Sequence, residues 1–436
     1  MKTKNKTKLK ILLLVLILVC CLPLTACYDA VEIDEEVYAL VIGVDKGTTN
    51  IIRVTVKYET YKEGGGGGSG GKGGGSGEEE GTVIATVEAP SLLEGINMLN
   101  LSANRQISLF HTKMLVFSEE YAREGVIRYL DPLSRFREVR ESMRVVVCQG
   151  TAEEFIKESK AVVGKNISKE LELSFFQASN TAYFPDVFFY KFHIAILSPY
   201  GQPVAIYAGV NDFEQESREP KTETAGLRTE QSIPPGSIPR TGGDKGEFFG
   251  TAVFDGDKMV GYLDQNETRF YQMVIGGFKW GLFTLPDKKS PGNIYVLEVK
   301  EVKKPQVKVT LREGKPIIDL KLAIEADISS MQSERKYEDI ESFRELESET
   351  VAYFQEGIKK TITKSQREMN SDIFFFGKKA ARNFRTIQEM EDYNWLKRYS
   401  EAEVKVEVDL NLRRTGFVFE TKPVRSSSGS KGGNSK

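Results

Sequence analysis

The chain has 436 residues, enough for two or three domains of roughly 100–200 residues, and its 40% hydrophobic and 28% charged residues are ordinary globular usage. Residues 1–26 hold five lysines and no acid, so the remainder has 55 bases against 62 acids, a net charge of −7 that argues against nucleic acid as the main partner. Two histidines and four cysteines, three of them before residue 28, exclude a disulfide framework in the body of the chain, and also a structural zinc site made of four cysteines or of two cysteines and two histidines.

The N-terminus has the pattern of a secretory signal peptide. Five lysines precede an unbroken apolar run over 11–22, which is too short to span about 30 Å of hydrocarbon. The segment 24–27, Leu-Thr-Ala-Cys, then resembles the bacterial lipobox, whose cysteine is lipidated and becomes the new N-terminus. We expect residues 1–26 to be removed and Cys27 to carry an S-diacylglycerol group, optionally with an N-acyl chain, that tethers the chain outside the cytoplasmic membrane. An ordinary signal peptide or an uncleaved anchor helix is the alternative.

Residue patterns predict an N-terminal domain over 27–212 in which strands and helices alternate. The expected strands are 37–44, 51–60, 82–88, 107–117, 144–148 and 203–210; the expected helices are 91–105, 119–130, 152–162 and two within 167–200. The glycine-rich tract 64–77 predicts a flexible loop. Its Gly66-x4-Gly71-Lys72 begins like a P-loop, but Gly73 stands where Ser or Thr is required, so nucleotide binding is not expected there.

Residues 213–246 are polar and predict a long exposed loop or an interdomain linker, followed by a C-terminal domain over 247–424. Asp255-Gly256-Asp257 predicts a hairpin turn between two strands within 248–263. Further on, 270–281 fits strand or helix; strands are expected at 294–309, 316–328 and 404–412, and an amphipathic helix at 340–369. Residues 425–436 form a Ser/Gly/Lys-rich tail that is expected to be disordered.

Few side chains invite a chemical interpretation. His111 is expected to be a partly buried strand residue bonded to the backbone, and Cys148 a buried structural thiol. The Arg135–Arg140 segment predicts a solvated, ion-paired helix face, with contact to a partner or to anionic lipid head groups as the alternative. The aromatic residues of 167–200 predict core packing, with a partner-facing or membrane-facing surface as the alternative.

Carboxylates are the remaining candidates for catalysis, as in an envelope hydrolase. Asp255 with Asp257, or Glu267, could be proposed as a catalytic pair of carboxylates. We interpret them as turn acids and surface charge, because no aromatic subsites or histidine partner surround them. We therefore predict no catalytic, cofactor-binding or metal-binding residue and no cofactor, and assign Cys27 as the single site residue.

Five passages stand in a fixed order along the chain. They are Cys27-Tyr28-Asp29 with Glu32-Ile33 and Gly43-x-Asp45-Lys46; His111-x-Lys113 with Glu120, Ala122, Gly125 and Arg135–Arg140; Gly250-Thr251-Ala252-Val253-Phe254 with Gly261-x-Leu263 and Glu267-Thr268-Arg269; Ser371-Asp372-Ile373-Phe374-Phe375-Phe376-Gly377; and Trp395 with Arg413-Arg414-Thr415-Gly416. Together they resemble the Ger(x)C family of spore germination lipoproteins, the C-type subunits of germinant receptors. Tyr28 replaces the family's usual Trp, and Phe375 stands where the family tends to have Gly, a change that affects a local turn.

The resemblance implies a multidomain α+β (mixed α/β) fold with mixed sheets and packed helices. It also implies a non-enzymatic subunit of a nutrient germinant receptor that assembles with two polytopic membrane subunits at the inner spore membrane. We expect the subunit to stabilise or couple that complex through the aromatic segment Phe184–Phe192 or through its C-terminal domain. The alternative is an extracytoplasmic solute-binding lipoprotein of a transporter, although the order of elements does not suggest two similar lobes.

Overall fold

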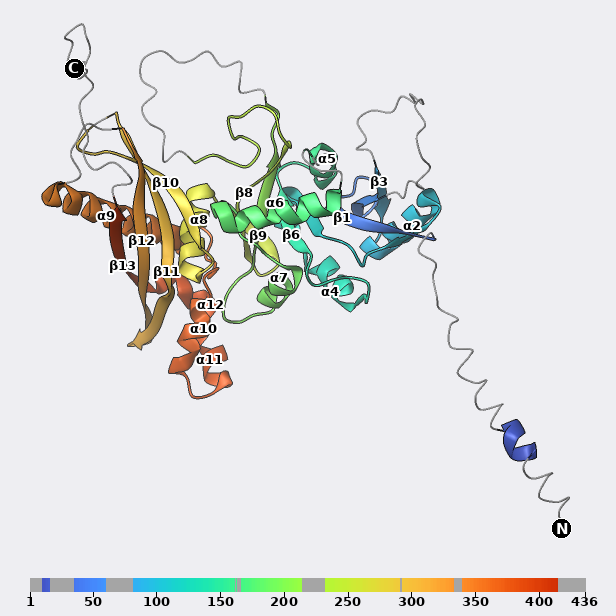
Figure 1. Ribbon diagram of the computed structural model, residues 1–436. Helices are drawn as coiled ribbons and strands as arrows, with labels where there is room; N and C mark the ends of the chain where they lie inside the picture. The colour runs from blue at the N-terminus through green and yellow to red at the C-terminus, as the bar shows by residue number, and fades with distance from the viewer. Residues whose placement is uncertain are drawn as a thin grey trace, which may run out of the picture.

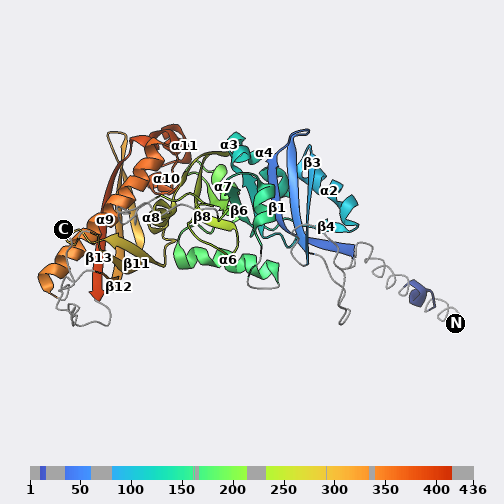
Figure 2. The ribbon, with the colours of Figure 1, turned by 90° about the horizontal axis from the view of Figure 1, so that it is seen from above.

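The structure is a computed structural model that describes residues 10–15, 35–59, 81–160, 162, 166–213, 232–290, 292–332 and 339–414. Across these residues the chain forms two sheets in succession, with helices packed on both (Figures 1 and 2). The mixed α+β fold class is confirmed. Cys27, the glycine-rich tract 64–77 and the tail 425–436 lie outside the described residues. No helix among the described residues is long and apolar enough to cross a membrane.

The larger sheet has nine strands within the described residues and combines a parallel centre with antiparallel edges. Along the sheet the order is β3-β2-β1-β5-β6-β7-β8-β9, and β4 pairs with β1 beside β5. Strands β1, β4, β5, β6 and β7 run parallel, whereas β2, β3, β8 and β9 join as antiparallel neighbours. The bounds are β1 (Glu36–Lys46), β2 (Ile52–Glu59), β3 (Thr82–Ala89), β4 (Gln106–Ser108), β5 (Met114–Ser118), β6 (Arg144–Cys148), β7 (Val204–Val210), β8 (Gly246–Asp255) and β9 (Lys258–Leu263).

Helices cover both faces of this sheet, which explains why its central strands are almost wholly apolar. In β6, Val145 and Val147 enter the main hydrophobic cluster, while Val146 and Cys148 enter a second cluster on the opposite face. Helices α5 and α6 cover the second cluster, and α2, α4 and α7 cover the main one. The bounds are α2 (Leu92–Ala103), α3 (Glu119–Glu124), α4 (Ile127–Arg135), α5 (Ala152–Glu158), α6 (Ile167–Thr181) and α7 (Phe189–Ile196).

The smaller sheet consists of the strands β10-β11-β12-β13, with β13 parallel to β12 and the other pairs antiparallel. Long apolar alternation in 294–328 produces its central hairpin, which turns at Glu313 and Gly314. One side of the long helix α9 is buried against this sheet through Phe354, Ile358 and Ile362. The bounds are α8 (Gln265–Ile275), β10 (Trp280–Pro286), β11 (Ile294–Arg312), β12 (Lys315–Met331), α9 (Ile340–Arg367), α10 (Phe376–Ala380), α11 (Ile387–Tyr393), α12 (Trp395–Arg398) and β13 (Glu403–Arg414), with 3-10 turns at Ala381–Asn383 and Tyr399–Glu401.

A single hydrophobic cluster continues from the larger sheet into the smaller one through α8. The ring of Phe270 on α8 lies 6.5 Å from that of Phe283 and 6.3 Å from that of Phe354, centroid to centroid. Asp264 and Glu267 form a capping box that starts α8 in this position. Because each buried aromatic side chain contributes roughly 1.5–3 kcal/mol of burial energy, the shared core favours one folded body over two loosely joined ones.

Several sequence expectations differ from the structure. Residues 107–117 are two strands, β4 and β5, separated by a turn. Residues 119–130 form two helices instead of one, because the chain turns at Gly125 with φ of 124°, a conformation that favours glycine. Helix α4 ends at Arg135, so most of the Arg135–Arg140 segment is not helical. The ambiguous stretch 270–281 contains both: its first half is the end of the helix α8, and its last two residues begin the strand β10.

The segment 213–246 joins two neighbouring strands of the same sheet. Strand β7 ends at Val210 and pairs with β8, which starts at Gly246, so the described part of this segment belongs to a loop within the larger sheet. Strands β8 and β9 therefore complete the larger sheet although they follow that loop. The domain boundaries given from the sequence stay a prediction.

Packing of α8 against α9 depends on Gly357. A Cβ atom at this position would lie 2.3 Å from Cζ of Phe270. Gly357→Ala is expected to lower the free energy of unfolding, because overpacking of about 1–3 kcal/mol exceeds the gain in helix propensity of about 1 kcal/mol. Urea unfolding measures the change, with Ser348→Ala on the exposed side of α9 as the control. Unchanged stability in Gly357→Ala would contradict this packing.

Candidate functional site

The first sequence motif, Gly43-x-Asp45-Lys46, holds α5 onto the larger sheet. Oδ1 and Oδ2 of Asp45 accept the backbone N–H groups of Ala152 and Glu153 at 2.7 and 3.0 Å. A Cβ on Gly43 would lie 2.6 Å from Cδ1 of Ile156, so glycine allows the helix to approach the strand. Burial raises the pKa of the Asp45 carboxyl, against the opposing effect of these hydrogen bonds. The motif therefore has a structural role.

The second motif lies near the start of β5. His111 is exposed in the turn before that strand, and its ring makes an edge contact with Tyr38 at 4.6 Å, so the expectation of a partly buried strand histidine was wrong. Nζ of Lys113 pairs with Glu172 on α6 at 2.6 Å. His193 on α7 lies far along the chain and contacts Asp131 on α4, with 2.8 Å between Nε2 and Oδ1. Each histidine thus has its own separate contact.

Cys148 is fully buried, which confirms the predicted structural thiol. Burial raises the pKa of this thiol well above its usual value, so it stays protonated at neutral pH. Protonated thiols are poor nucleophiles. Among the described residues no group of three His, Cys, Asp or Glu side chains is arranged to hold a metal ion.

The carboxylates considered for catalysis contact different elements. Asp257 accepts the backbone N–H of Ile127 at 3.3 Å through Oδ2 and that of Val126 at 3.0 Å through its carbonyl oxygen, so it fastens the start of α4. Oε2 of Glu267 accepts from Nζ of Lys364 on α9 at 2.6 Å. Asp255 is exposed at the end of β8. Asp255 and Asp257 are turn acids, as interpreted from the sequence, whereas Glu267 belongs to the capping box of α8 and is partly buried beside Lys364, so the interpretation as surface charge was wrong for Glu267.

The fourth and fifth motifs meet at a buried polar cluster between the two sheets, which we call the Asp372 junction (Ser371, Asp372, Gly377, Trp395 and Gln202). The Asp372 side chain is fully buried and accepts from Nε1 of Trp395 at 2.7 Å. It also accepts the backbone N–H groups of Phe376 and Gly377 at 3.2 and 2.9 Å, which holds the start of α10. Burial raises the pKa of this carboxyl to about 6, although all three hydrogen bonds act to lower it.

Two further hydrogen bonds tie the Asp372 junction to the larger sheet. Oγ of Ser371 donates to the carbonyl oxygen of Phe254 on β8 at 2.6 Å. The N–H of Gln202 donates to the carbonyl oxygen of Asp372 at 2.9 Å, and the Gln202 side chain accepts from the N–H of Gly256 at 2.7 Å. Segments more than 100 residues apart in the chain are thus held together by buried polar bonds.

The turn inside the fourth motif explains its residue types. Phe375 has φ of 58°, a left-handed conformation in which glycine is usual and a bulky side chain is strained. A Cβ on Gly377 would lie 2.5 Å from both Cδ1 of Trp395 and the carbonyl oxygen of Tyr200, so only glycine fits there. The expectation that Phe375 replaces glycine at a local turn agrees with this geometry.

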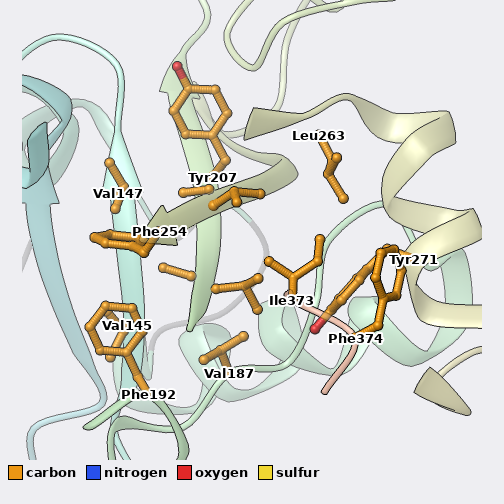
Figure 3. Close-up of a cluster of buried hydrophobic side chains, with 14 of the residues drawn as sticks. Val145, Val147, Val187, Phe192, Tyr207, Phe254, Leu263, Tyr271, Ile373 and Phe374 are labelled. Atoms are coloured by element: carbon orange, nitrogen blue, oxygen red, sulfur yellow. The ribbon is translucent and has the colours of Figure 1, made fainter. Parts of the chain in front are cut away.

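The residues that directly follow Asp372 enter a cluster of buried apolar side chains (Figure 3). Ile373 and Phe374 from the fourth motif lie in the same cluster as Phe254 of the third motif, together with Leu263 and Tyr271. The ring centroids of Phe374 and Tyr271 are 5.6 Å apart. The third and fourth motifs therefore build the contact between the two halves of the molecule.

The aromatic segment Phe184–Phe192 is mainly core. Phe184, Phe189 and Phe192 are 4%, 1% and 1% exposed, so alanine substitutions there would test folding more than partner contact. The exposed aromatic residues of this region are Phe176 on α6 and Tyr190 on α7. The structure thus separates a buried aromatic set from a smaller exposed set that the sequence did not resolve.

Two buried polar side chains near the contact between the two sheets, Gln272 and Gln202, were not predicted from the sequence. Nε2 of Gln272 donates to the carbonyl oxygens of Ala182 and Phe184 at 2.8 and 3.0 Å. Gln202 has the bridging role described above. The sequence does contain a signal for Gln272, because a polar glutamine stands inside the apolar run 270–274. Gln202 lies in a short loop, where the sequence pattern gives no sign of burial.

Comparisons with known proteins agree with the order of motifs. Residues 29–210 match a family model described as spore germination protein N-terminal domain, and residues 249–416 match one described as spore germination B3/GerAC like, C-terminal. A Bacillus subtilis (strain 168) protein described as a spore germination protein, YfkR, is 21% identical over 416 residues, which cover 92% of this chain and 96% of that protein. The crystal structure of the GerBC protein has a similar fold, with a TM-score of 0.51 and 15% identity over 85% of this chain and 96% of that one.

Trp395 is one of two tryptophans, which provides a matched test of the Asp372 junction. Trp395→Phe removes the indole N–H and leaves a buried carboxylate one donor short, so the free energy of unfolding should fall by about 1–3 kcal/mol. Trp280 is 37% exposed on β10, and Trp280→Phe should cost much less. Urea unfolding followed by circular dichroism compares the two; equal losses would contradict the role of the indole N–H.

Asp372 also predicts a dependence of stability on pH. Its pKa is about 6 in the folded chain against an ordinary 3.8, so the folded state binds this proton more tightly than the unfolded state does. The stabilisation from Asp372 is therefore complete below pH of about 4 and is lost as pH rises through about 6. The unfolding free energy of the wild type, relative to Asp372→Asn, should fall across this window. A difference that is constant with pH would refute the raised pKa.

Proposed function

The chain belongs to the GerAC-like family of spore germination proteins, and from this premise we propose that it is a lipid-anchored, non-catalytic subunit of a nutrient germinant receptor. In this proposal Cys27 carries the lipid, and the folded body lies outside the cytoplasm at the inner spore membrane. Its partners are two polytopic membrane subunits. It needs no cofactor and binds no nucleic acid.

The observation that carries the proposal is the location of the motif residues. Asp45 and Asp372 each accept backbone N–H groups that hold helices in place, and Glu267 accepts the backbone N–H of Asp264 in the capping box of α8. The third and fourth motifs form the buried contact between the two sheets. Residues used in this way maintain the shape of a binding subunit, whereas an enzyme family would place its characteristic side chains around a reacting group.

A rigid body suits the coupling role. The Asp372 junction and the shared core join the two sheets, so force applied at one surface is transmitted to the other without being absorbed by a hinge. We propose that the subunit stabilises the receptor by holding its membrane subunits in a fixed relation. Its contacts with them use exposed side chains, since the aromatic segment Phe184–Phe192 is largely committed to the core.

A solute-binding lipoprotein is the less favoured alternative. Solute-binding proteins of that kind close two similar lobes about a hinge. Here the described residues form a nine-stranded mixed sheet and a four-stranded sheet, which differ in size and strand order. Among the described residues one hydrophobic core runs through both sheets, whereas a hinged protein has a separate core in each lobe.

Partner capture tests the proposal. A tag on the C-terminus, crosslinking in intact spores and mass spectrometry of the inner membrane fraction should recover two polytopic membrane proteins. Cys27→Ala should abolish that recovery because the lipid is lost, whereas the matched control Cys20→Ala should retain it. Recovery of an ATP-driven transporter, or of no membrane protein, would contradict a receptor subunit and support the solute-binding alternative.

A further inference from the structure

We propose that one exposed face beside the larger sheet lies on the membrane and binds anionic phospholipid head groups. We call it the α7 face, and it consists of Tyr190, Ile194 and Leu197 with Arg135, Arg137 and Arg140. The inference rests on the proposed function in one respect, the lipid at Cys27, and it adds how the anchored body is oriented on the bilayer.

The apolar half of the α7 face is a stripe that runs along the outside of α7 and continues to Leu197, the residue that follows the helix. The inner side of this helix is buried through Phe189 and Phe192, at 1% exposure each. On the outer side, Ile194 and Leu197 are 63% and 66% exposed, and Tyr190 is 38% exposed. Spacings of four and three residues place these side chains on one line along the helix. A helix with an exposed apolar stripe opposite its buried side is typical of a surface that contacts a membrane or a partner.

The basic half borders this stripe. Arg135, Arg137 and Arg140 are all exposed, and within the described ranges none of them forms an ion pair. Lys191 adds a fourth exposed base, with its Nζ 5.9 Å from the ring centroid of Tyr190. Exposed arginines beside an apolar stripe match a surface of phosphate groups above hydrocarbon.

Three acids lie in the same region, and two of them contact other groups of the protein. Oε2 of Glu138 accepts the backbone N–H of Leu109 at 3.3 Å, and Asp131 contacts His193. Glu141 is an exposed acid at the edge of the face. Four bases, Arg135, Arg137, Arg140 and Lys191, thus stand against the three acids Asp131, Glu138 and Glu141, so the α7 face has a small excess of positive charge in a chain whose body is acidic overall.

Hydrogen bonds hold the two halves of the face together. The N–H of Phe189 donates to the carbonyl oxygen of Met143 at 2.8 Å, and that of Tyr190 to the carbonyl oxygen of Glu141 at 3.3 Å. The contact between His193 and Asp131 links α7 to α4. Helices α4 and α7 accordingly lie near each other on the lower side of the molecule in Figure 1.

The path of the chain places the anchor at the same edge. Strands β1, β5, β6 and β7 are parallel, so their amino ends share one edge of the sheet, and the segments that carry the α7 face lead into β6 and β7 there. Strand β1 starts at Glu36, nine residues after Cys27, a stretch of at most about 30 Å. Phe110, 41% exposed in the turn before β5, adds an apolar side chain to this edge. A lipid on Cys27 thus keeps this edge within about 30 Å of the bilayer.

Depth-dependent quenching in vesicles tests the α7 face. The full-length lipidated chain is placed in vesicles of phosphatidylcholine and phosphatidylglycerol that contain a lipid with a quencher on its acyl chain. A dye on Leu197→Cys should be quenched several-fold more than a dye on Ile340→Cys, a control that is 71% exposed at the start of α9. Equal quenching at the two positions would overturn the proposal.

Charge reversal tests the head-group contact. Arg135→Glu with Arg140→Glu should lower the quenching at position 197 several-fold, as should vesicles of phosphatidylcholine alone. Lys288→Glu with Lys289→Glu, the same charge change in exposed residues between β10 and β11, should leave it unchanged. If the quenching at position 197 changes neither with the charge reversal nor with removal of phosphatidylglycerol, the role of anionic lipid is overturned.

Two further measurements, vesicle flotation and crosslinking in spores, distinguish a failure of this proposal from a failure of the proposed function. Flotation of the Cys27→Ala chain on vesicles of phosphatidylcholine alone, where the head-group contact of the α7 face is lost, reports the anchor, so a chain that floats there equally well without Cys27 contradicts the lipid assignment. Crosslinks in spores from position 197 to a polytopic subunit would assign the α7 face to a protein partner and overturn the lipid contact, with the receptor role intact.

Discussion

The buried carboxylate of Asp372 organises the contact on which the rest of the structure depends. Nothing charged is stable in a protein interior unless hydrogen bonds replace the lost water, and here an indole N–H and two backbone N–H groups do so. Those bonds fix the start of α10, while Ser371 and Gln202 fasten the same segment to the larger sheet. Together with the apolar core that continues between the two sheets through α8, these hydrogen bonds fix the relative position of the sheets.

Sequence patterns predicted what depends on local periodicity. Continuous apolar runs and alternation identified most strands, and the amphipathic pattern of 340–369 identified α9 with its buried face. The errors occurred where a turn interrupts an apolar run: the turn around His111 was hidden inside one predicted strand, and Gly125 divided one predicted helix. The pairing of β7 with β8 across the 213–246 segment joins residues too distant in the chain for any local signal.

The candidate site residues also differ in whether a local sequence pattern or only the fold reveals their role. Cys27 was assigned from a local motif, and it lies outside the residues that the structure describes. The roles of Asp45 and Asp372 needed the fold, because their donors come from α5, α10 and α12. The family resemblance identified these residues as important, and the geometry supplies the physical reason: each is a buried acceptor that positions a helix. The exposed stripe on α7 became separable from the buried aromatic set only once burial was known.

Hydrogen exchange tests the central claim, that the two sheets form one rigid body through the Asp372 junction. The amide protons of Phe376 and Gly377, which donate to Asp372, can be compared with those of the central strands β6 and β12. We predict that all of them exchange through one global unfolding event, with similar free energies of opening. Exchange at Phe376 and Gly377 that is much faster than in both strands, or two separate opening events for the two sheets, would contradict the account.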